Sequence, residues 1–262
     1  MANVENIVKI MNFHSLLRVD KAKRKAEKYF EVEKELAIMM SQILYNRNLN
    51  LDEKILVQNE RGVSLNFYLG NDLGFCGNFN SLVRRQAEED FDVQKIMIGK
   101  KIFSDSKDVI LNISKEDFYR DFTPIEEIIY PLITSKRLKE LNVIYNHYYN
   151  VNDIRLEVKK IFPTESEKEE VDVDSDYVIE TDVNQVLTQL ILIYLCYQLK
   201  ILEANSWASE NVMREKTTRE SLSKIEEIEE EKAKYRRKEK KYQAFKKQIS
   251  NYRRVGEKDG DR

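Results

Sequence analysis

The segment DVNQVLTQLILIYLCYQLKILEANSWASE, residues 182–210, begins a run that continues to about Tyr252 without a Pro or a Gly. Its apolar residues recur at the three- and four-residue spacing of a helix face, namely Val183, Val186, Leu187, Leu190, Ile191 and Tyr194. Further along, the pattern narrows to a seven-residue repeat through Ile228, Tyr235, Tyr242 and Ile249, with Phe245 and Tyr252 three residues after the last two. We therefore predict one helix of roughly 105 Å, capped by Asp182, whose seam requires a partner helix.

The N-terminal residues 3–46 predict a second long helix. One heptad phase holds Val8, Ala22, Tyr29, Leu36 and Ile43, and a companion phase holds Val4, Met11, Val32 and Met39. The two phases alternate at four and three residues, as in a coiled-coil seam, with polar gaps at Ser15, Arg18 and Lys25. NRNLN, residues 46–50, ends this helix with turn-forming residues. We expect the two terminal helices to pair antiparallel.

The middle of the chain alternates between strand-like and helix-like segments. The predicted strands are KILVQN (54–59), VSLNFYLGN (63–71), and residues 93–98, 109–113, 143–149, 154–162 and 177–180. The predicted helices are 81–90 and 124–138, the second with Thr123 as N-cap and Pro131 kinking or shortening it. Residues 164–176 are rich in Glu and Asp and predict a solvated loop. Alternation of this kind indicates a small α/β domain with a partly parallel sheet.

The predicted fold class is thus α/β plus a long antiparallel coiled coil. Residues 1–50 and 182–262 form the coiled-coil shaft, and residues 51–181 form a small Rossmann-like base domain between them.

Composition excludes several classes of function. The net charge of −2 gives no global attraction to nucleic acid or to a membrane surface. The two cysteines, Cys76 and Cys196, and the two histidines, His14 and His147, form no disulfide or metal-ligand spacing. The longest unbroken apolar stretch has eight residues, far below the ~20 that span a bilayer. We expect a cytoplasmic protein without membrane insertion, catalytic residues, bound cofactor or metal.

Several residue strings, in order along most of the chain, resemble the gamma subunit of F-type ATP synthases, the central stalk. GNDLGFCGNFN (70–80) resembles the family's S-D-R-G-L-C-G-G-F-N, and IMIGKK (96–101) resembles its strand ending in G-x-K. ELNVIYNHYYN (140–150) is similar to its strand carrying V-Y-N. DYVIE (176–180) followed by LEANSWASENVMR (202–214) resembles D-Y-I-F-E-P and L-E-S-x-A-S-E-x-x-x-R-M.

The resemblance singles out two sets of residues. Asp72, Gly74, Cys76 and Gly77 would form a turn of the base domain, and Glu203, Ser209, Glu210 and Arg214 would lie at the base of the shaft.

The chain also departs from the family pattern. Residues 16–30 do not reproduce K-I-T-x-A-M-x-M-V-A, Leu73 replaces an Arg, and the tip keeps Gln243 and Ala244 but has Tyr242 in place of an Arg. In these departures the chain resembles the additional F1-like ATPases of wall-less bacteria.

The glycine-rich turn allows two interpretations. A phosphate cradle is one, but the spacing of Gly70, Gly74 and Gly77 is neither G-x-G-x-x-G nor G-x-x-x-x-G-K-[ST]. A tight strand-to-helix turn that needs positive φ angles is the other, and it is favoured.

The C-terminal helix carries an acidic block, residues 226–231, followed by a basic stretch. The basic stretch could be a solvated face with pairs such as Glu230 with Lys234, a nucleic-acid surface, or a collar facing acidic loops of a surrounding ring. The family resemblance implies such loops on catalytic beta subunits. The candidate ring contacts are Lys232, Arg236, Arg237, Lys240, Lys241 and Gln243.

Three hypotheses for function follow. The first is a gamma-type rotor shaft that couples ATP hydrolysis or synthesis, in a ring of alpha- and beta-type subunits holding ATP and magnesium, to rotation of a load. An epsilon-like subunit is a further expected partner, and the location would be peripheral at the inner face of the cell membrane. The second hypothesis is a static coiled-coil adaptor within an F1-like assembly. The third is a nucleotide-binding α/β enzyme with a coiled-coil appendage.

Overall fold

The structure is a computed structural model that describes residues 2–44, 59–163 and 182–259. Two long helices, α1 (Ala2–Leu44) and α5 (Val183–Asp259), flank a sheet-containing region in the sequence. We call this region, residues 59–163, the α/β module. The chain divides into two compact units, Phe13–Thr217 and Met1–Asn12 with Thr218–Arg262, which are described in turn.

A five-stranded sheet forms the centre of the larger unit, Phe13–Thr217. Its strands are β1 (Val63–Leu69), β2 (Gln94–Ile98), β3 (Val109–Ile113), β4 (Leu138–Asn150) and β5 (Asp153–Phe162), in the order β3-β2-β1-β4-β5. All neighbouring pairs are parallel except β4 and β5, which form an antiparallel hairpin. The prediction of a partly parallel sheet is confirmed.

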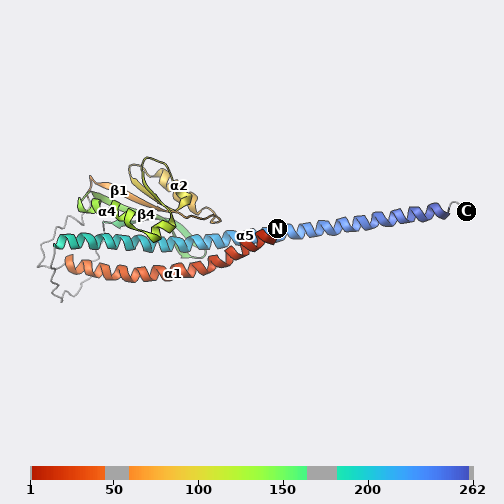
Figure 1. Cartoon of the computed structure of the whole chain (residues 1–262), viewed down its shortest axis with the longest axis horizontal. Helices are drawn as coiled ribbons and strands as arrows, with labels where there is room; N and C mark the ends of the chain where they lie inside the picture. The colour runs from red at the N-terminus through yellow and green to blue at the C-terminus, as the bar shows by residue number, and fades with distance from the viewer. Residues whose placement is uncertain (1, 45–58, 164–181, 260–262) are drawn as a thin grey trace. The chain divides into compact units, whose positions relative to one another are not determined.

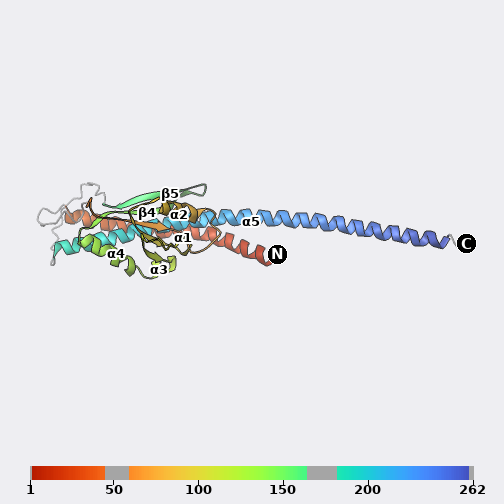
Figure 2. The same ribbon diagram turned by 90° about the horizontal axis from the view of Figure 1, so that it is seen from above.

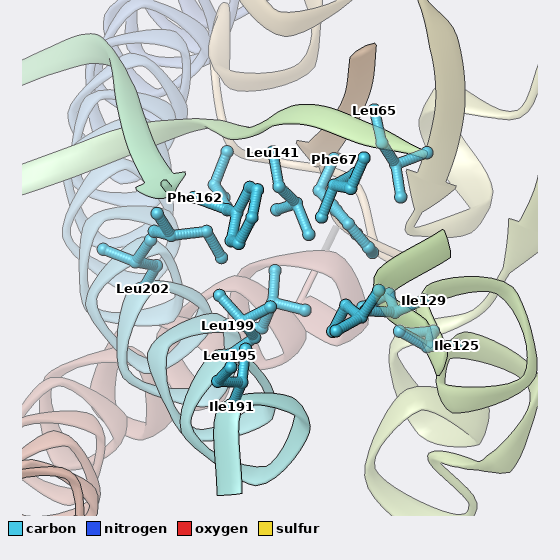
Figure 3. Close-up of a cluster of buried hydrophobic side chains, with 14 of the residues drawn as sticks. Leu65, Phe67, Ile125, Ile129, Leu141, Phe162, Ile191, Leu195, Leu199 and Leu202 are labelled. Carbon is cyan, nitrogen blue, oxygen red and sulfur yellow. The ribbon is translucent and has the colours of Figure 1, made fainter. Parts of the chain in front are cut away.

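Both faces of the sheet are covered. On one face, Leu65, Phe67, Leu141 and Phe162 of the sheet point toward Ile191, Leu195, Leu199 and Leu202 of α5, with Ile125 and Ile129 of α4 (Thr123–Thr134) beside them (Figure 3). On the other face, α2 (Phe79–Glu89) and the 3-10 turn η2 (Lys100–Ile102) pack on Tyr68, Met97 and Ile144. The first half of α5 is therefore a core element of this unit, because its apolar stripe completes the hydrophobic core.

Within the same unit, α1 and α5 run antiparallel and side by side (Figures 1 and 2). Gln198 Nε2 donates to Glu33 Oε1 at 2.7 Å, and the rings of Tyr29 and Tyr197 meet edge to face with centroids 6.0 Å apart. The predicted pairing of the terminal helices with an α/β region between them in the sequence is confirmed.

The buried stripe of α1 differs from the predicted seam in one of its two phases. The phase of Val8, Ala22, Leu36 and Ile43 is buried, and Ser15 in the same phase is also fully buried. In the companion phase, Val4, Val32 and Met39 are exposed, so that part of the prediction is wrong. The buried companions are Val19 and Met40, one position later. Leu36, Met40 and Ile43 belong to the sheet's hydrophobic core, so the stripe faces the sheet as well as α5.

Several element boundaries differ from the predictions. Thr123 is the first residue of α4 and not its N-cap, because Phe122 holds that position and Asp121 Oδ1 accepts from the Thr123 N–H at 3.0 Å. Pro131 lies inside α4, the helix ends at Thr134, and β4 then begins at Leu138, five residues before the predicted strand. The short helix α3 (Lys115–Arg120), capped by Ser114, was not predicted.

Other predictions on the same segments are confirmed or untested. Asp182 caps α5 as predicted, since its Oδ1 accepts from Asn184 N at 2.9 Å. The predicted strand 54–59, except Asn59, lies outside the described residues, and so do the predicted loop 164–176 and strand 177–180.

The smaller unit, Met1–Asn12 with Thr218–Arg262, contains the ends of both long helices. Asn12 Nδ2 donates to Thr218 Oγ1 at 3.0 Å. Glu5 raises the pKa of Lys9, and Glu226 and Glu229 of α5 add to this effect, so the antiparallel pairing continues here. Ala2 would fall beside about residue 228, because it lies ten residues before Asn12 on an antiparallel partner. Beyond that point α5 continues past the end of α1 (Figure 1).

The predicted C-terminal seam is exposed in this unit. Tyr235, Tyr242, Phe245 and Ile249 expose 70%, 65%, 60% and 41% of their surface, and Ile228 exposes 46%. The prediction that α1 covers this seam is wrong, because Tyr235 and the seam residues after it lie beyond the reach of α1, and Ile228 lies only at its very end.

One helix among the described residues passes the length and composition test for a membrane span. It is the part Val183–Ile249 of α5, which contains an 18-residue window of mean hydropathy 1.4. Core packing accounts for this hydropathy, because Leu187, Ile191, Leu195 and Leu199 are fully buried within the Phe13–Thr217 unit.

Candidate functional site

The two sets of residues singled out in the base-domain turn and in the shaft base meet in the structure. Arg214 of α5 is 2% exposed, and its guanidinium reaches the turn after β1. Its Nε donates to the Gly74 carbonyl at 3.3 Å and its Nη2 to Cys76 Sγ at 3.1 Å. The same guanidinium pairs with Glu210, one helical turn earlier. We call this contact region between α5 and the turn the junction.

A lysine from α3 completes the junction. The ammonium of Lys115 lies 3.0 Å from Glu203 Oε1 and 2.8 Å from Glu210 Oε2, and all three side chains are buried. Two carboxylates and two cations are thus enclosed together, as burial of charge requires. Lys115 was not among the predicted site residues. The pattern Ser114-x-x-Asp117 resembles a capping box and could have predicted that a helix begins at Lys115.

The pKa values in the junction show how burial and pairing compete. Burial lowers the pKa of Lys115, but Glu210 and Glu203 outweigh that effect and the net pKa is raised. Burial raises the pKa of Glu203, and Lys115 opposes the rise only in part. Burial also raises the pKa of Glu210, but Lys115 and Arg214 together hold that pKa below the usual range.

The turn itself gathers the carboxyl ends of three parallel strands. Asp72, just after β1, accepts at Oδ1 from the Lys100 N–H at 2.8 Å and at Oδ2 from the Lys115 N–H at 3.1 Å. These two N–H groups follow β2 and β3. Cys76 Sγ lies 3.0 Å from the amide Nδ2 of Asn71 and 3.2 Å from the Gly74 carbonyl. Asp72 therefore ties the three strand ends into the loop that receives Arg214.

Only one of the three clustered glycines needs a positive φ. Gly77 has φ +56°, and the other left-handed residue of the turn is Phe75 at +62°. Gly70 is required for space, since a Cβ there would lie 2.7 Å from the Ile102 side chain. A Cβ at Gly74 would meet nothing within 4 Å. The interpretation as a structural turn with positive φ angles is supported, with Gly77 and Phe75 as the left-handed residues.

Ser209 joins α5 to the neighbouring strand. Its hydroxyl donates to the Asn146 carbonyl of β4 at 2.7 Å, and the Asn205 side chain accepts from the Tyr148 N–H at 2.7 Å. Six residues of the two predicted sets are linked in the junction, namely Asp72, Gly74, Cys76, Glu203, Glu210 and Arg214. Ser209 makes a separate contact between α5 and β4, and Gly77 is a left-handed residue of the turn.

The candidate ring contacts lie on the C-terminal part of α5, in the smaller unit. Lys232, Arg236, Arg237, Lys240, Lys241 and Gln243 are all exposed on this helix. Glu230 and Lys234 form the predicted i,i+4 pair at 3.8 Å. Nothing in the described residues tests what these side chains contact, so their role stays a prediction.

Among the described residues, no group of three or more His, Cys, Asp or Glu side chains could hold a metal ion. The expectation that the chain binds no metal stays a prediction. His147 Nδ1 lies 2.7 Å from the Tyr145 hydroxyl, and Cys76 and Cys196 are separately buried free thiols.

Comparison with known proteins places these features in a wider context. An ATP synthase family model matches residues 1–244. The chain is 27% identical over 226 residues to an ATP synthase gamma chain of Clostridium novyi, covering 81% of this chain and 78% of that one. It is 23% identical over 208 residues to an ATP synthase gamma chain of Mycoplasma capricolum, with 74% of each covered.

Among solved structures, the chain is similar to one from the central stalk and c-ring of the Tetrahymena thermophila mitochondrial ATP synthase. The TM-score is 0.54 at 15% identity, covering 82% of this chain and 99% of that one. This likeness supports the fold.

Proposed function

This chain belongs to the ATP synthase gamma-chain family, and from that premise we propose that it is the central rotor shaft of an F-type or F1-like rotary ATPase. A surrounding ring of alpha- and beta-type subunits would bind ATP with magnesium and carry out hydrolysis or synthesis. This chain would contribute no catalytic residue. Its work would be mechanical, because successive closures of the ring subunits would turn an asymmetric helix.

The observation that carries this proposal is the buried junction. A shaft must pass torque from the helix that the ring pushes to whatever load it drives. Here α5 is fastened to the α/β module by enclosed ion pairs, by Arg214 in the turn after β1, and by the Ser209 bond to β4. Hydrogen-bonded charges without access to water resist displacement far better than exposed pairs.

The charge pattern of the exposed part of α5 suits a weak and shifting contact. Lys232, Arg236, Arg237, Lys240 and Lys241 would face acidic loops of the beta-type subunits. Charge complementarity of this kind increases the rate of association and fixes the orientation of the contact more than it increases the affinity. A rotor requires that property, since tight binding at any one ring position would stall rotation.

The α/β module would carry the load. We propose that an epsilon-like subunit, a c-ring or another driven element binds it. The complex would be cytoplasmic and held peripherally at the inner face of the cell membrane.

The two other hypotheses are less well supported. A static adaptor is not favoured, because the relatives are gamma chains and the similar solved structure is a central stalk. Nucleotide binding at the glycine-rich turn is also disfavoured, because the Asp72 carboxylate accepts from the Lys100 and Lys115 N–H groups and would repel phosphate.

The test is rotation in the isolated complex. The chain should purify with three copies each of two larger subunits. Cys76 is too buried to label, at 4% exposure, so a bead should be attached through Val151→Cys, where Val151 is 61% exposed at the β4–β5 turn. We expect the bead to rotate during ATP hydrolysis. A ring that hydrolyses ATP while the bead stays fixed would instead support the static adaptor.

A further inference from the structure

Glu203 differs from the other charged residues of the junction because no donor is aligned to hydrogen-bond with it. Its side chain is completely buried, and neither of its carboxylate oxygens accepts a hydrogen bond from the described residues. The Lys115 ammonium lies 3.0 Å from Oε1, but it donates to Glu210 Oε2 at 2.8 Å. Glu210 accepts a second hydrogen bond, from Arg214. The two cations therefore both donate to Glu210, and Glu203 is left with an ion pair alone.

Charged and titratable groups face Glu203 from three helices. Lys115 of α3 and Lys25 of α1 attract its negative charge, and Glu210 of α5 repels it. Tyr29 of α1 also lies close enough for its pKa to be raised, first by burial and then by the charge of Glu203. Glu203 thus lies where α1, α3 and α5 meet.

Neither of the two attracting cations serves Glu203 alone. Lys25 is half-buried, and its ammonium lies over the Tyr119 ring of α3, 3.2 Å from the ring centroid. A cation above an aromatic face is already partly stabilised there. Lys115 is shared with Glu210. The negative charge of Glu203 is therefore only partly compensated, at a position that water does not reach.

A neutral carboxylic acid is easier to bury than a carboxylate, because the ion gives up far more hydration. Burial is the largest influence on the pKa of Glu203 and raises it above the usual 4.5. Lys115 and Lys25 oppose this rise, and Glu210 adds to it. The folded chain therefore binds a proton at Glu203 more readily than the unfolded chain does.

We propose that Glu203 is a proton-binding site built into the junction, where a fall in pH strengthens the attachment of α5 to α1 and α3. Glu203 takes up the proton while it stays buried, so the partly compensated charge disappears. Lys115 then serves Glu210 alone, and both donors of Glu210 stay in place. The inference concerns this chain by itself and does not depend on the rotor proposal.

The direction of the effect follows from the linkage between proton binding and folding. Above the folded pKa, Glu203 is ionised in both the folded and the unfolded chain, and its buried charge lowers stability. Between that pKa and 4.5 only the folded chain holds the proton, so the loss is relieved as pH falls. Glu210 has a lowered pKa, so its own contribution is lost only below 4.5 and does not mask this gain.

Unfolding equilibria of the full-length chain, measured in urea at a series of pH values, test the inference. From about pH 7.5 to about pH 5, the ratio of folded to unfolded chain should rise by about threefold or more relative to Glu203→Gln. Gln has the shape of Glu but takes up no proton in this range. Glu127→Gln, which removes an exposed carboxylate from α4, is the matched control and should follow the parent. A ratio that stays constant or falls relative to Glu203→Gln would overturn the inference.

Carbon-13 NMR of the glutamate carboxyl groups observes the proton directly in the folded chain. Glu203→Gln identifies the signal, and backbone assignment of the parent does so even if that variant fails to fold. We expect a titration midpoint above 4.5, and a higher one in Lys25→Met, because that variant removes an opposing cation. A midpoint at or below 4.5, or no rise in Lys25→Met, would contradict a proton-binding site at this position.

Discussion

At the residue scale, the junction depends on four charged side chains that are almost completely removed from water. Glu203, Glu210 and Arg214 could be predicted because they stand in a string resembling the family pattern. Lys115 could not, because a lysine in a charged run such as KEDFYR is more often exposed. Only the path of the chain after β3 brings its ammonium between two carboxylates on α5.

Removing Lys115 should be far more costly than removing a surface lysine. Lys115→Met leaves Glu203 and Glu210 buried with one cation fewer, and we expect a loss of about 3–5 kcal/mol in the free energy of unfolding. Lys160→Met, which breaks the more exposed pair with Glu140, should cost at most about 1 kcal/mol. Urea unfolding of the purified chain measures both. Adding Glu203→Gln to Lys115→Met should recover part of the loss, and equal costs for the two lysine variants would contradict the enclosed pairing.

Cys76 should make stability fall at alkaline pH. Burial raises its pKa from 9.0 to about 11, with Arg214 opposing the rise. The unfolded chain ionises this thiol from about pH 9, whereas the folded chain keeps the proton. The contribution of Cys76 to the free energy of unfolding is therefore complete below pH 9 and is lost as pH rises toward 11. The slope is about 1.4 kcal/mol per pH unit. Cys76→Ala should make the decline of unfolding free energy between pH 9 and 11 shallower by that amount. An unchanged slope would show that the folded thiol ionises normally.

At the scale of elements, α1 shows what periodicity can and cannot decide. The helix and one of its two heptad phases follow from the sequence, because both depend on local spacing. The second buried phase is displaced by one position, to Val19 and Met40. That displacement depends on the sheet, since Met40 packs into the sheet's hydrophobic core. The buried residues of a helix that packs against both another helix and a sheet cannot all be identified from the heptad pattern of a two-helix coiled coil.

Two adjacent methionines of α1 provide a matched test. Met40 is 5% exposed and Met39 is 49% exposed. Met40→Ala should lower the free energy of unfolding by about 2–3 kcal/mol, because it leaves a cavity in the core. Met39→Ala should change it by less than about 0.5 kcal/mol. Chemical denaturation of the two variants gives the comparison, and a larger loss at Met39 would restore the seam predicted from the sequence.

The exposed seam of α5 leads to a different expectation. Ile249 is 41% exposed, and none of the described residues of α1 reaches it. Ile249→Asp should therefore leave the thermal midpoint of the isolated chain within about 1–2 °C of the parent, whereas Leu199→Ala should lower it by several degrees. A large loss at Ile249 would mean that another part of the chain covers the seam.

At the scale of the whole molecule, membership of the family and the exposed charges of α5 both bear on how this chain contacts other subunits. The acidic block and the basic stretch lie close together on one helix, yet only the basic stretch is proposed to face the ring. The buried junction, in contrast, concerns how one chain holds itself together. These two roles can be separated by experiment, because they use different residues.

Charge reversal should distinguish the two exposed stretches. Converting Arg236, Arg237, Lys240 and Lys241 to Glu should lower the ATPase rate of the isolated complex by on the order of tenfold, as four exposed pairs of about 0.35 kcal/mol each imply. Converting Glu226, Glu227, Glu229 and Glu230 to Lys should have a smaller effect. The difference should shrink as salt rises, because exposed charges are screened. Equal losses at low salt would count against the basic collar.

The two long helices, the alternation of strands and helices between them, and the strings that indicate the family all follow from the order of the amino acids alone. These features are local, since they depend on spacing along the chain. Only the packing of distant segments fixes which face of α1 is buried, where α1 ends its pairing with α5, and that the Lys115 ammonium is enclosed. Burial arises from contacts between segments that are far apart in the sequence, so local spacing cannot specify it. A lysine has the same local pattern whether it is enclosed between carboxylates, as Lys115 is, or lies half exposed beside one, as Lys160 does.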